Sequence, residues 1–216
     1  MISFSQVSKR FKGGQQALNN VSFTIESGEM VCVTGHSGAG KSTLLKLMAA
    51  IELPSNGTVL VANQNIGKLR PAAIPYLRRN LGLVFQDHKL LYERSVFDNT
   101  ALPLLVQGVP RDEIGKRVRA ALDKVGLLGF EKALPVTLSG GEQQRLCIAR
   151  AIVSRPAVLL ADEPTGNLDP EYARSIMDMF KSFHQVGVTV VIATHDETML
   201  QYMGGRTLSL SHGVLQ

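Results

Sequence analysis

The chain has little of what marks secreted and membrane-spanning proteins. Its 216 residues include only two cysteines, Cys32 and Cys147, and both fall inside apolar patterns far apart in the sequence. This usage favours reduced, buried thiols in a cytosolic protein over a disulfide framework. No apolar run approaches the roughly 18–20 residues that cross a bilayer. The N-terminal residues lack the charged and then apolar pattern of a secretory signal, so we expect neither a membrane span nor export.

Repeats, low-complexity tracts and blocks of like charge are also missing. Apolar residues make up 44% and charged residues 19% of the chain, values typical of a globular protein. The net charge of +5 comes from scattered cations, with pairs such as Lys9-Arg10 and Arg78-Arg79. We interpret them as a solvated surface with a slight bias toward an anionic membrane face. Length and composition predict one domain over residues 1–216, without an appended regulatory domain.

A glycine-rich loop carries the strongest positive signal. It consists of Gly35, His36, Ser37, Gly38, Ala39, Gly40, Lys41, Ser42 and Thr43, and it fits the pattern G-x-x-x-x-G-K-[ST]. In this pattern backbone N–H groups surround phosphates, the lysine reaches the β and γ oxygens, and the hydroxyl holds Mg²⁺. The β-rich run Met30–Thr34 precedes the loop and a helix-forming segment follows it, which is the context that the motif requires. The sequence therefore predicts a nucleotide site here.

Two adjacent carboxylates follow a second apolar run. Val158–Ala161 has the composition of a buried strand, and Asp162 and Glu163 come directly after it. Asp162 is a candidate Mg²⁺ ligand, and Glu163 is a candidate to polarise a water in line with the γ-phosphorus. The alternative for this pair is an ordinary solvated strand end.

A turn of small residues precedes the helix-forming segment 142–153. Leu138 is followed by Ser139, Gly140 and Gly141, so a hydroxyl and free N–H groups gather at a helix start. This arrangement indicates a second anion site. The same residues also fit a capping box, in which Ser139 and Glu142 satisfy each other's backbone. The two interpretations are compatible.

Together these motifs resemble the ATP-binding-cassette (ABC) ATPases over essentially the whole chain. Gln86, after the strand-like run Leu81–Phe85, matches the family's Q-loop, Gly166-Asn167-Leu168-Asp169 matches its D-loop, and His195 matches its switch histidine. Phe11 stands where the family usually has a tyrosine that stacks on adenine, and phenylalanine keeps the π face. Each position also has an ordinary alternative, such as core packing for Phe11 or helix capping for Asp169.

The resemblance implies a Mg²⁺-dependent ATPase that works as a homodimer. Two copies would face each other head to tail and enclose two ATP molecules. Each ATP would meet Lys41, Ser42, Gln86, Asp162, Glu163 and His195 of one copy and Ser139, Gly140, Gly141 and Asp169 of the other. Within this set, Glu163, His195 and Gln86 are implied to be catalytic, and Ser42, Gln86 and Asp162 are implied to hold Mg²⁺. Because both copies contact the γ-phosphate, ATP would join them and hydrolysis would release them.

Within this family the chain most resembles the FtsE group of bacterial cell-division ATPases. The matching residues are His36 in the phosphate loop, Leu77–Arg79, Phe85–His88 and Ala121–Leu128. The segment 162–169 is shared with the lipoprotein-releasing and macrolide-export ATPases, which remain the alternative. ABC ATPases that act on DNA or the ribosome typically carry two cassettes or a long coiled-coil insertion, so no nucleic acid is expected.

This resemblance implies an FtsX-like integral membrane partner and an indirect link to the division machinery through control of cell-wall hydrolysis. It also implies a peripheral position on the cytoplasmic face of the bacterial inner membrane.

The order of elements predicts an α/β fold, a P-loop NTPase core with an N-terminal antiparallel β part and a helical subdomain. Two early strands, near 2–7 and 21–25, are expected to pair across the Gly13-Gly14 turn, and segment 71–79 is expected to form one helix. No core-strand pattern occurs within 87–136, so this segment is expected to be the helical subdomain, inserted between core segments 1–86 and 137–216. The resemblance implies a coupling groove between the core and this insertion, which begins at Gln86 and runs through Asp87, His88, Lys89, Leu90 and Leu91. Leu90 and Leu91 are expected to be exposed there and to receive a short helix of the partner. Alternatively, they pack the insertion onto the core.

Overall fold

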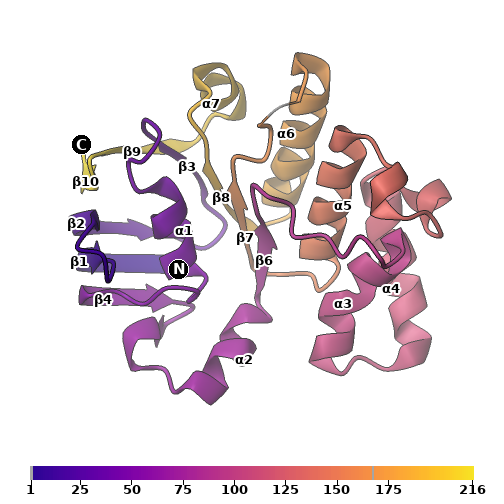
Figure 1. Ribbon diagram of the computed structural model, residues 1–216, viewed down its shortest axis with the longest axis horizontal. Helices are drawn as coiled ribbons and strands as arrows, with labels where there is room; N and C mark the ends of the chain where they lie inside the picture. Colours follow the sequence, from indigo (N-terminus) through magenta and orange to yellow (C-terminus); the bar gives the residue numbers. More distant parts are fainter. Residues whose placement is uncertain (1, 167) are drawn as a thin grey trace.

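The computed structural model describes residues 2–166 and 168–216, which form two β-sheets and surrounding helices (Figure 1). The strands are β1 (Ile2–Arg10), β2 (Gln16–Ile25), β3 (Met30–Thr34), β4 (Asn56–Val61), β5 (Gln64–Asn65), β6 (Leu81–Val84), β7 (Val158–Asp162), β8 (Thr189–Ala193), β9 (Arg206–Ser211) and β10 (Val214–Leu215). The α-helices are α1 (Lys41–Met48), α2 (Ile74–Arg78), α3 (Val96–Gln107), α4 (Arg111–Lys124), α5 (Gly140–Ile152), α6 (Pro170–Gln185) and α7 (Glu197–Met203). Short 3₁₀ turns cover Ile66–Lys68, Pro71–Ala73, Leu128–Phe130 and Pro135–Thr137.

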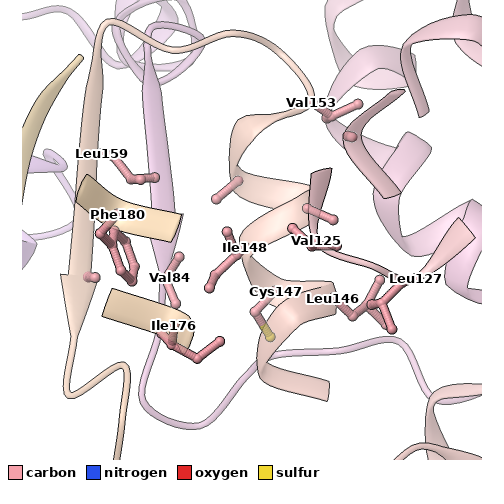
Figure 2. Close-up of a cluster of buried hydrophobic side chains, with 14 of the residues drawn as sticks. Val84, Val125, Leu127, Leu146, Cys147, Ile148, Val153, Leu159, Ile176 and Phe180 are labelled. Carbon is pink, nitrogen blue, oxygen red and sulfur yellow. The ribbon is translucent and has the colours of Figure 1, made fainter. Parts of the chain in front are cut away.

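The larger sheet has the order β10-β9-β3-β8-β7-β6, and its members β9, β3, β8, β7 and β6 pair in parallel. Because successive side chains of a strand point to opposite faces, each buried strand contributes side chains to a hydrophobic core on either face of the sheet. Leu159 packs with α5 and α6, whereas Leu160 packs with α1. Figure 2 shows the first of these cores, where Ile148 of α5 and Phe180 of α6 meet strand residues such as Val84. The predicted α/β class is confirmed.

The smaller sheet is antiparallel and has the order β2-β1-β4-β5. Ile2 pairs with Ile25 and with Val61, so β1 lies between β2 and β4. The two early strands therefore pair as predicted, although both extend further toward the Gly13-Gly14 turn than their apolar residues indicate. This sheet packs against α1 and thereby supports the loop that precedes that helix.

Helices α3 and α4 occupy the predicted insertion, beside α5 (Figure 1). The helix α5 contacts α3, α4 and β6, so it joins this region to the core. Because of these contacts, the boundaries of a separate helical subdomain at residues 87–136 stay a prediction. None of the helices in residues 2–166 and 168–216 combines the length and apolar character needed to cross a membrane.

Three local expectations differ from the structure. The segment 71–79 was expected to form one helix, but it forms a 3₁₀ turn and then α2, because Pro71 and Pro75 lack the backbone donors of a continuous helix. The prediction that both leucines are exposed is wrong for Leu90, which is only 7% exposed and belongs to the core of α3, α4 and α5. Leu91 is half-buried, and its N–H and C=O are both bonded to the Asn99 side chain.

Candidate functional site

The glycine-rich loop joins β3 to α1, and its glycines are required by both space and backbone angle. Gly35 and Gly40 have φ values of 144° and 110°. A Cβ atom on Gly35 would lie 2.2 Å from the Leu210 carbonyl oxygen, and one on Gly40 would lie 2.6 Å from that of Ala17. Gly38, with φ of 79°, has nothing within 4 Å of such an atom. The loop is therefore held tightly from behind and open in front, as a cradle for an anion must be.

The C-terminal hairpin of β9 and β10 supports this loop. The Gly213 N–H donates to the Ala39 carbonyl at 3.0 Å, and the Gly213 carbonyl accepts from Asn19 at 2.8 Å. The imidazole of His212 lies 4.7 Å from that of His36, between ring centroids. Sequence reasoning missed this support, because no motif in the last residues marks them as neighbours of a loop 170 or so positions away.

The loop opens into a cavity of about 430 Å³ that brings most predicted site residues together. It is lined by Phe11, Gln15, Ala17, Ser37, Gly38, Ala39, Gly40, Lys41, Ser42, Thr43, Lys46, Gln86, Glu163 and His195. Phe11 is half-buried, with the Lys9 ammonium 5.1 Å from its ring centroid. Sequence reasoning missed Gln15, Ala17 and Lys46. Lys46 could have been found, because it lies four residues after Ser42 on one face of a helix.

One carboxylate oxygen links the loop to the neighbouring strand ends. Glu163 Oε1 lies 3.5 Å from Lys41 Nζ and 2.9 Å from His195 Nδ1. The Lys41 ammonium also donates to the Gly35 carbonyl at 2.8 Å, and the side chain is nearly buried. Glu163 has a φ of 47° and its N–H donates to the Ala193 carbonyl of β8. The backbone thus holds this carboxylate over the phosphate loop between two nitrogen groups.

Asp162 is the second carboxylate at the end of β7, and its surroundings differ from those of Glu163. Burial raises the pKa of its carboxyl, and the charge of Glu163 raises it further, while a hydrogen bond with Ser42 and the charges of Lys46 and Lys41 lower the pKa. Among the described residues, Asp162 Oδ1 is buried without a hydrogen-bond partner. A buried carboxylate oxygen beside a hydroxyl fits a hard cation such as Mg²⁺, which prefers oxygen ligands and retains several waters.

The turn before α5 adopts the predicted capping box. The Glu142 N–H donates to Ser139 Oγ at 3.3 Å, and the Ser139 N–H donates to Glu142 Oε2 at 2.8 Å. Gly141 packs so closely on Tyr172 that an added Cβ would lie 2.8 Å from the ring, whereas Gly140 is open. Of the described residues that line the nucleotide cavity, none belongs to this turn. The cavity and the turn are thus separate sites on one chain.

Asp169 caps α6, since its Oδ1 accepts from the Glu171 and Tyr172 N–H groups at 3.1 Å each. It too is absent from the described lining of the cavity. Asn167, of the predicted D-loop, lies outside the described residues. The contact of Asp169 with ATP bound to a second copy therefore stays a prediction.

Both cysteines are free and buried, as their apolar surroundings predict. Burial raises the pKa of the Cys32 thiol to about 11 and that of Cys147 to about 12. Neither thiol forms a thiolate near neutral pH, so neither is a candidate nucleophile.

Comparisons with known proteins agree with this geometry. The family description "ABC transporter" matches residues 18–166. The chain is 54% identical to the Escherichia coli (strain K12) protein named cell division ATP-binding protein FtsE, over 100% of the chain and 97% of that relative. A Bacillus subtilis protein of the same name is 43% identical over 100% of the chain and 94% of its own length. A dimeric ATP-binding cassette, solved in a post-hydrolysis state bound to ADP and Pi, superposes with a TM-score of 0.93 at 34% identity, over 100% of this chain and 97% of that one.

Proposed function

Because this chain belongs to the ABC transporter family, and within it to the FtsE cell-division ATP-binding proteins, we propose that it is the ATPase subunit of a division complex. It binds and hydrolyses ATP, dimerises when ATP is bound, and changes the conformation of an FtsX-like integral membrane protein. That partner in turn regulates cell-wall hydrolysis. The subunit acts as a peripheral protein at the cytoplasmic face of the inner membrane.

The observation that carries this proposal is the single oxygen, Glu163 Oε1, that meets both Lys41 and His195 above the phosphate loop. When phosphates enter the cavity, Lys41 exchanges the Gly35 carbonyl and Glu163 for the β and γ oxygens. Glu163 is then free to take a proton from the attacking water, and His195 holds the carboxylate in place. Ser42, Asp162 and Gln86 would hold Mg²⁺, which supplies charge neutralisation at the phosphates when bound.

The separation of the two anion sites supports a head-to-tail dimer. Ser139 and Gly140 are exposed, and neither is among the described residues that line their own chain's cavity. A helix start with an exposed serine supplies a hydroxyl and backbone N–H groups for an anion. A second copy can place these groups against the γ-phosphate held by Lys41. Dimeric ATP-binding cassettes are among the structures that this chain resembles.

We expect Glu163→Gln protein to be monomeric without nucleotide and dimeric with ATP and Mg²⁺. Hydrolysis is blocked in this variant, so the γ-phosphate stays between the two copies. Light scattering after size-exclusion chromatography measures the change. A matched variant that also carries Ser139→Ala should dimerise less, because the second copy loses a donor. A mass that is the same with and without ATP would contradict the proposal.

A groove beside β6 is the best surface for the membrane partner. This cavity of about 280 Å³ lies between the core residues Arg78, Leu81, Leu83 and Phe85 and the α3 residues Leu102 and Pro103. Leu105 and Val106, also on α3, are 54% and 65% exposed. A short apolar helix of the partner can bind such a groove. The groove replaces the buried Leu90 as the proposed contact, and it keeps the predicted position after Gln86, next to Lys89.

The groove is tested by Leu102→Glu, which places a charge at its wall. We expect loss of co-purification with the FtsX-like partner and loss of division function, with ATP binding unchanged, because Leu102 is not among the described residues that line the nucleotide cavity. Val186→Glu is the matched control, since Val186 is exposed and does not line the groove. If the Leu102 variant still holds the partner as the wild type does, the groove is not the contact.

The alternative is the ATPase subunit of a lipoprotein-releasing or macrolide exporter, which shares the segment 162–169. The two functions differ in what the complete complex does. ATP-dependent movement of lipid or drug by the purified complex in liposomes would favour export. Its absence, together with ATP-dependent activation of a cell-wall hydrolase, would favour the division complex.

A further inference from the structure

The segment 66–80 carries an unusual distribution of charge. Although 18 of the 216 residues are acidic, none lies between Glu52 and Asp87, whereas Lys68, Arg70, Arg78 and Arg79 all do. We name residues 66–80 the basic arm. It comprises the 3₁₀ turns Ile66–Lys68 and Pro71–Ala73 and the helix α2. Figure 1 shows α2 at the lower edge of the molecule, on the other side of β6 from α3.

Two apolar anchors fix which side of the basic arm faces solvent. Ile66 and Leu77 are 0% and 1% exposed in the core around α1. Arg78 holds the arm from the same side, because its Nε and Nη2 donate to the Ala49 and Ala50 carbonyls after α1. The arm is therefore a supported surface and not a loose tail. Of the cations that remain, Lys68 and Arg70 are exposed and define the outer side of the arm. Arg79 is half-buried, and among the described residues its Nε is buried without a hydrogen-bond partner.

The outer side combines cations with an exposed aromatic ring. Lys68 and Arg70 are exposed, and in residues 2–166 and 168–216 neither forms a salt bridge. Tyr76 is 63% exposed, with the Arg79 guanidinium 4.5 Å from its ring centroid. Cations draw a protein toward anionic headgroups, and a tyrosine ring is favoured at the boundary between headgroups and acyl chains.

We propose that the outer side of the basic arm binds the anionic headgroups of a lipid bilayer. The arm adjoins the partner groove, because Arg78 contributes to both. Its placement toward the membrane rests on the proposed function, in which that groove holds a membrane protein. The arm then sets the orientation of the ATPase on the bilayer beside its partner. A bilayer fits these residues better than nucleic acid does, because the exposed Tyr76 ring suits the boundary between headgroups and acyl chains.

The test is co-sedimentation of the purified chain with vesicles, either phosphatidylglycerol mixed with phosphatidylcholine or phosphatidylcholine alone. Wild-type protein is expected to bind the anionic vesicles only, and to dissociate when salt is raised, because the Debye length shortens. Each cation near such a surface changes partitioning about five-fold, so the double variant Lys68→Gln, Arg70→Gln should bind about 25-fold more weakly. The control is Arg174→Gln, Lys181→Gln on α6, which should bind as the wild type does.

ATP binding by each variant verifies that it is folded. Equal binding of wild type to both vesicle types, or undiminished binding by the Lys68 and Arg70 variant, would overturn the proposal. So would salt-sensitive binding to duplex DNA without binding to anionic vesicles. Co-purification of the membrane partner is measured separately. If the chain binds anionic vesicles but co-purifies with no membrane partner, the proposed function is rejected and the proposal for the basic arm is retained. If it co-purifies with a membrane partner but does not bind anionic vesicles, only the proposal for the basic arm is rejected.

Discussion

Glu163→Gln protein is expected to hydrolyse ATP about 10²–10⁴-fold more slowly than the wild type, with the membrane partner present, and to retain its affinity for ATP. Glutamine keeps the size of the side chain and can still accept hydrogen bonds from Lys41 and His195. It cannot take a proton from water at neutral pH. ATP affinity should not fall, because the substitution removes a negative charge 3.5 Å from the ammonium that receives the phosphates.

Phosphate release under saturating ATP measures the rate, and nucleotide titration measures the affinity separately. The matched control is Glu26→Gln, which changes an exposed carboxylate in the turn before β3 and should leave both values unchanged. A near wild-type rate for the Glu163 variant would show that another group accepts the proton. A lower rate accompanied by an equal loss of ATP affinity would indicate that Glu163 supports binding and not the chemical step.

The part of the site that could be predicted from the sequence consists of residues next to strong local patterns. The phosphate loop, Asp162 with Glu163, and His195 all follow apolar strands that are parallel in the structure. Because the carboxyl ends of parallel strands meet at one edge of a sheet, such residues are brought together by the fold itself. The local hydrophobic pattern was therefore enough to predict that these site residues lie close together.

The residues that escaped prediction depend on contacts between distant segments. Nothing in the sequence near Gly213 indicates that its N–H supports Ala39, because that contact requires β9 to pair with β3. The burial of Leu90 has the same origin, since a leucine in a polar loop is buried only when α3, α4 and α5 close over it. Hydrophobic patterns report the secondary structure of a segment, and the tertiary packing decides which loop residues the core takes in.

Lys41→Ala is expected to weaken ATP binding itself, by about 10- to 100-fold in Kd. The ammonium makes charge-assisted hydrogen bonds to the β and γ phosphates, and such a bond contributes about 1.5–3 kcal/mol. The same ammonium donates to the Gly35 and His36 carbonyls and lies beside Glu163, so its position at the phosphate loop is held by the protein itself. Nucleotide titration, or the rise in thermal stability with ATP concentration, measures the loss.

Lys46→Ala separates this role from a general need for positive charge. Lys46 lines the same cavity from the next turn of α1, but it is exposed and does not contact the phosphate loop carbonyls that Lys41 binds. If placement matters, the Lys46 variant loses much less affinity than the Lys41 variant, because an exposed cation is screened by water and salt. Equal losses would mean that ATP is attracted by the net charge of α1. In that case the buried position of Lys41 and its contact with Glu163 would not account for phosphate recognition.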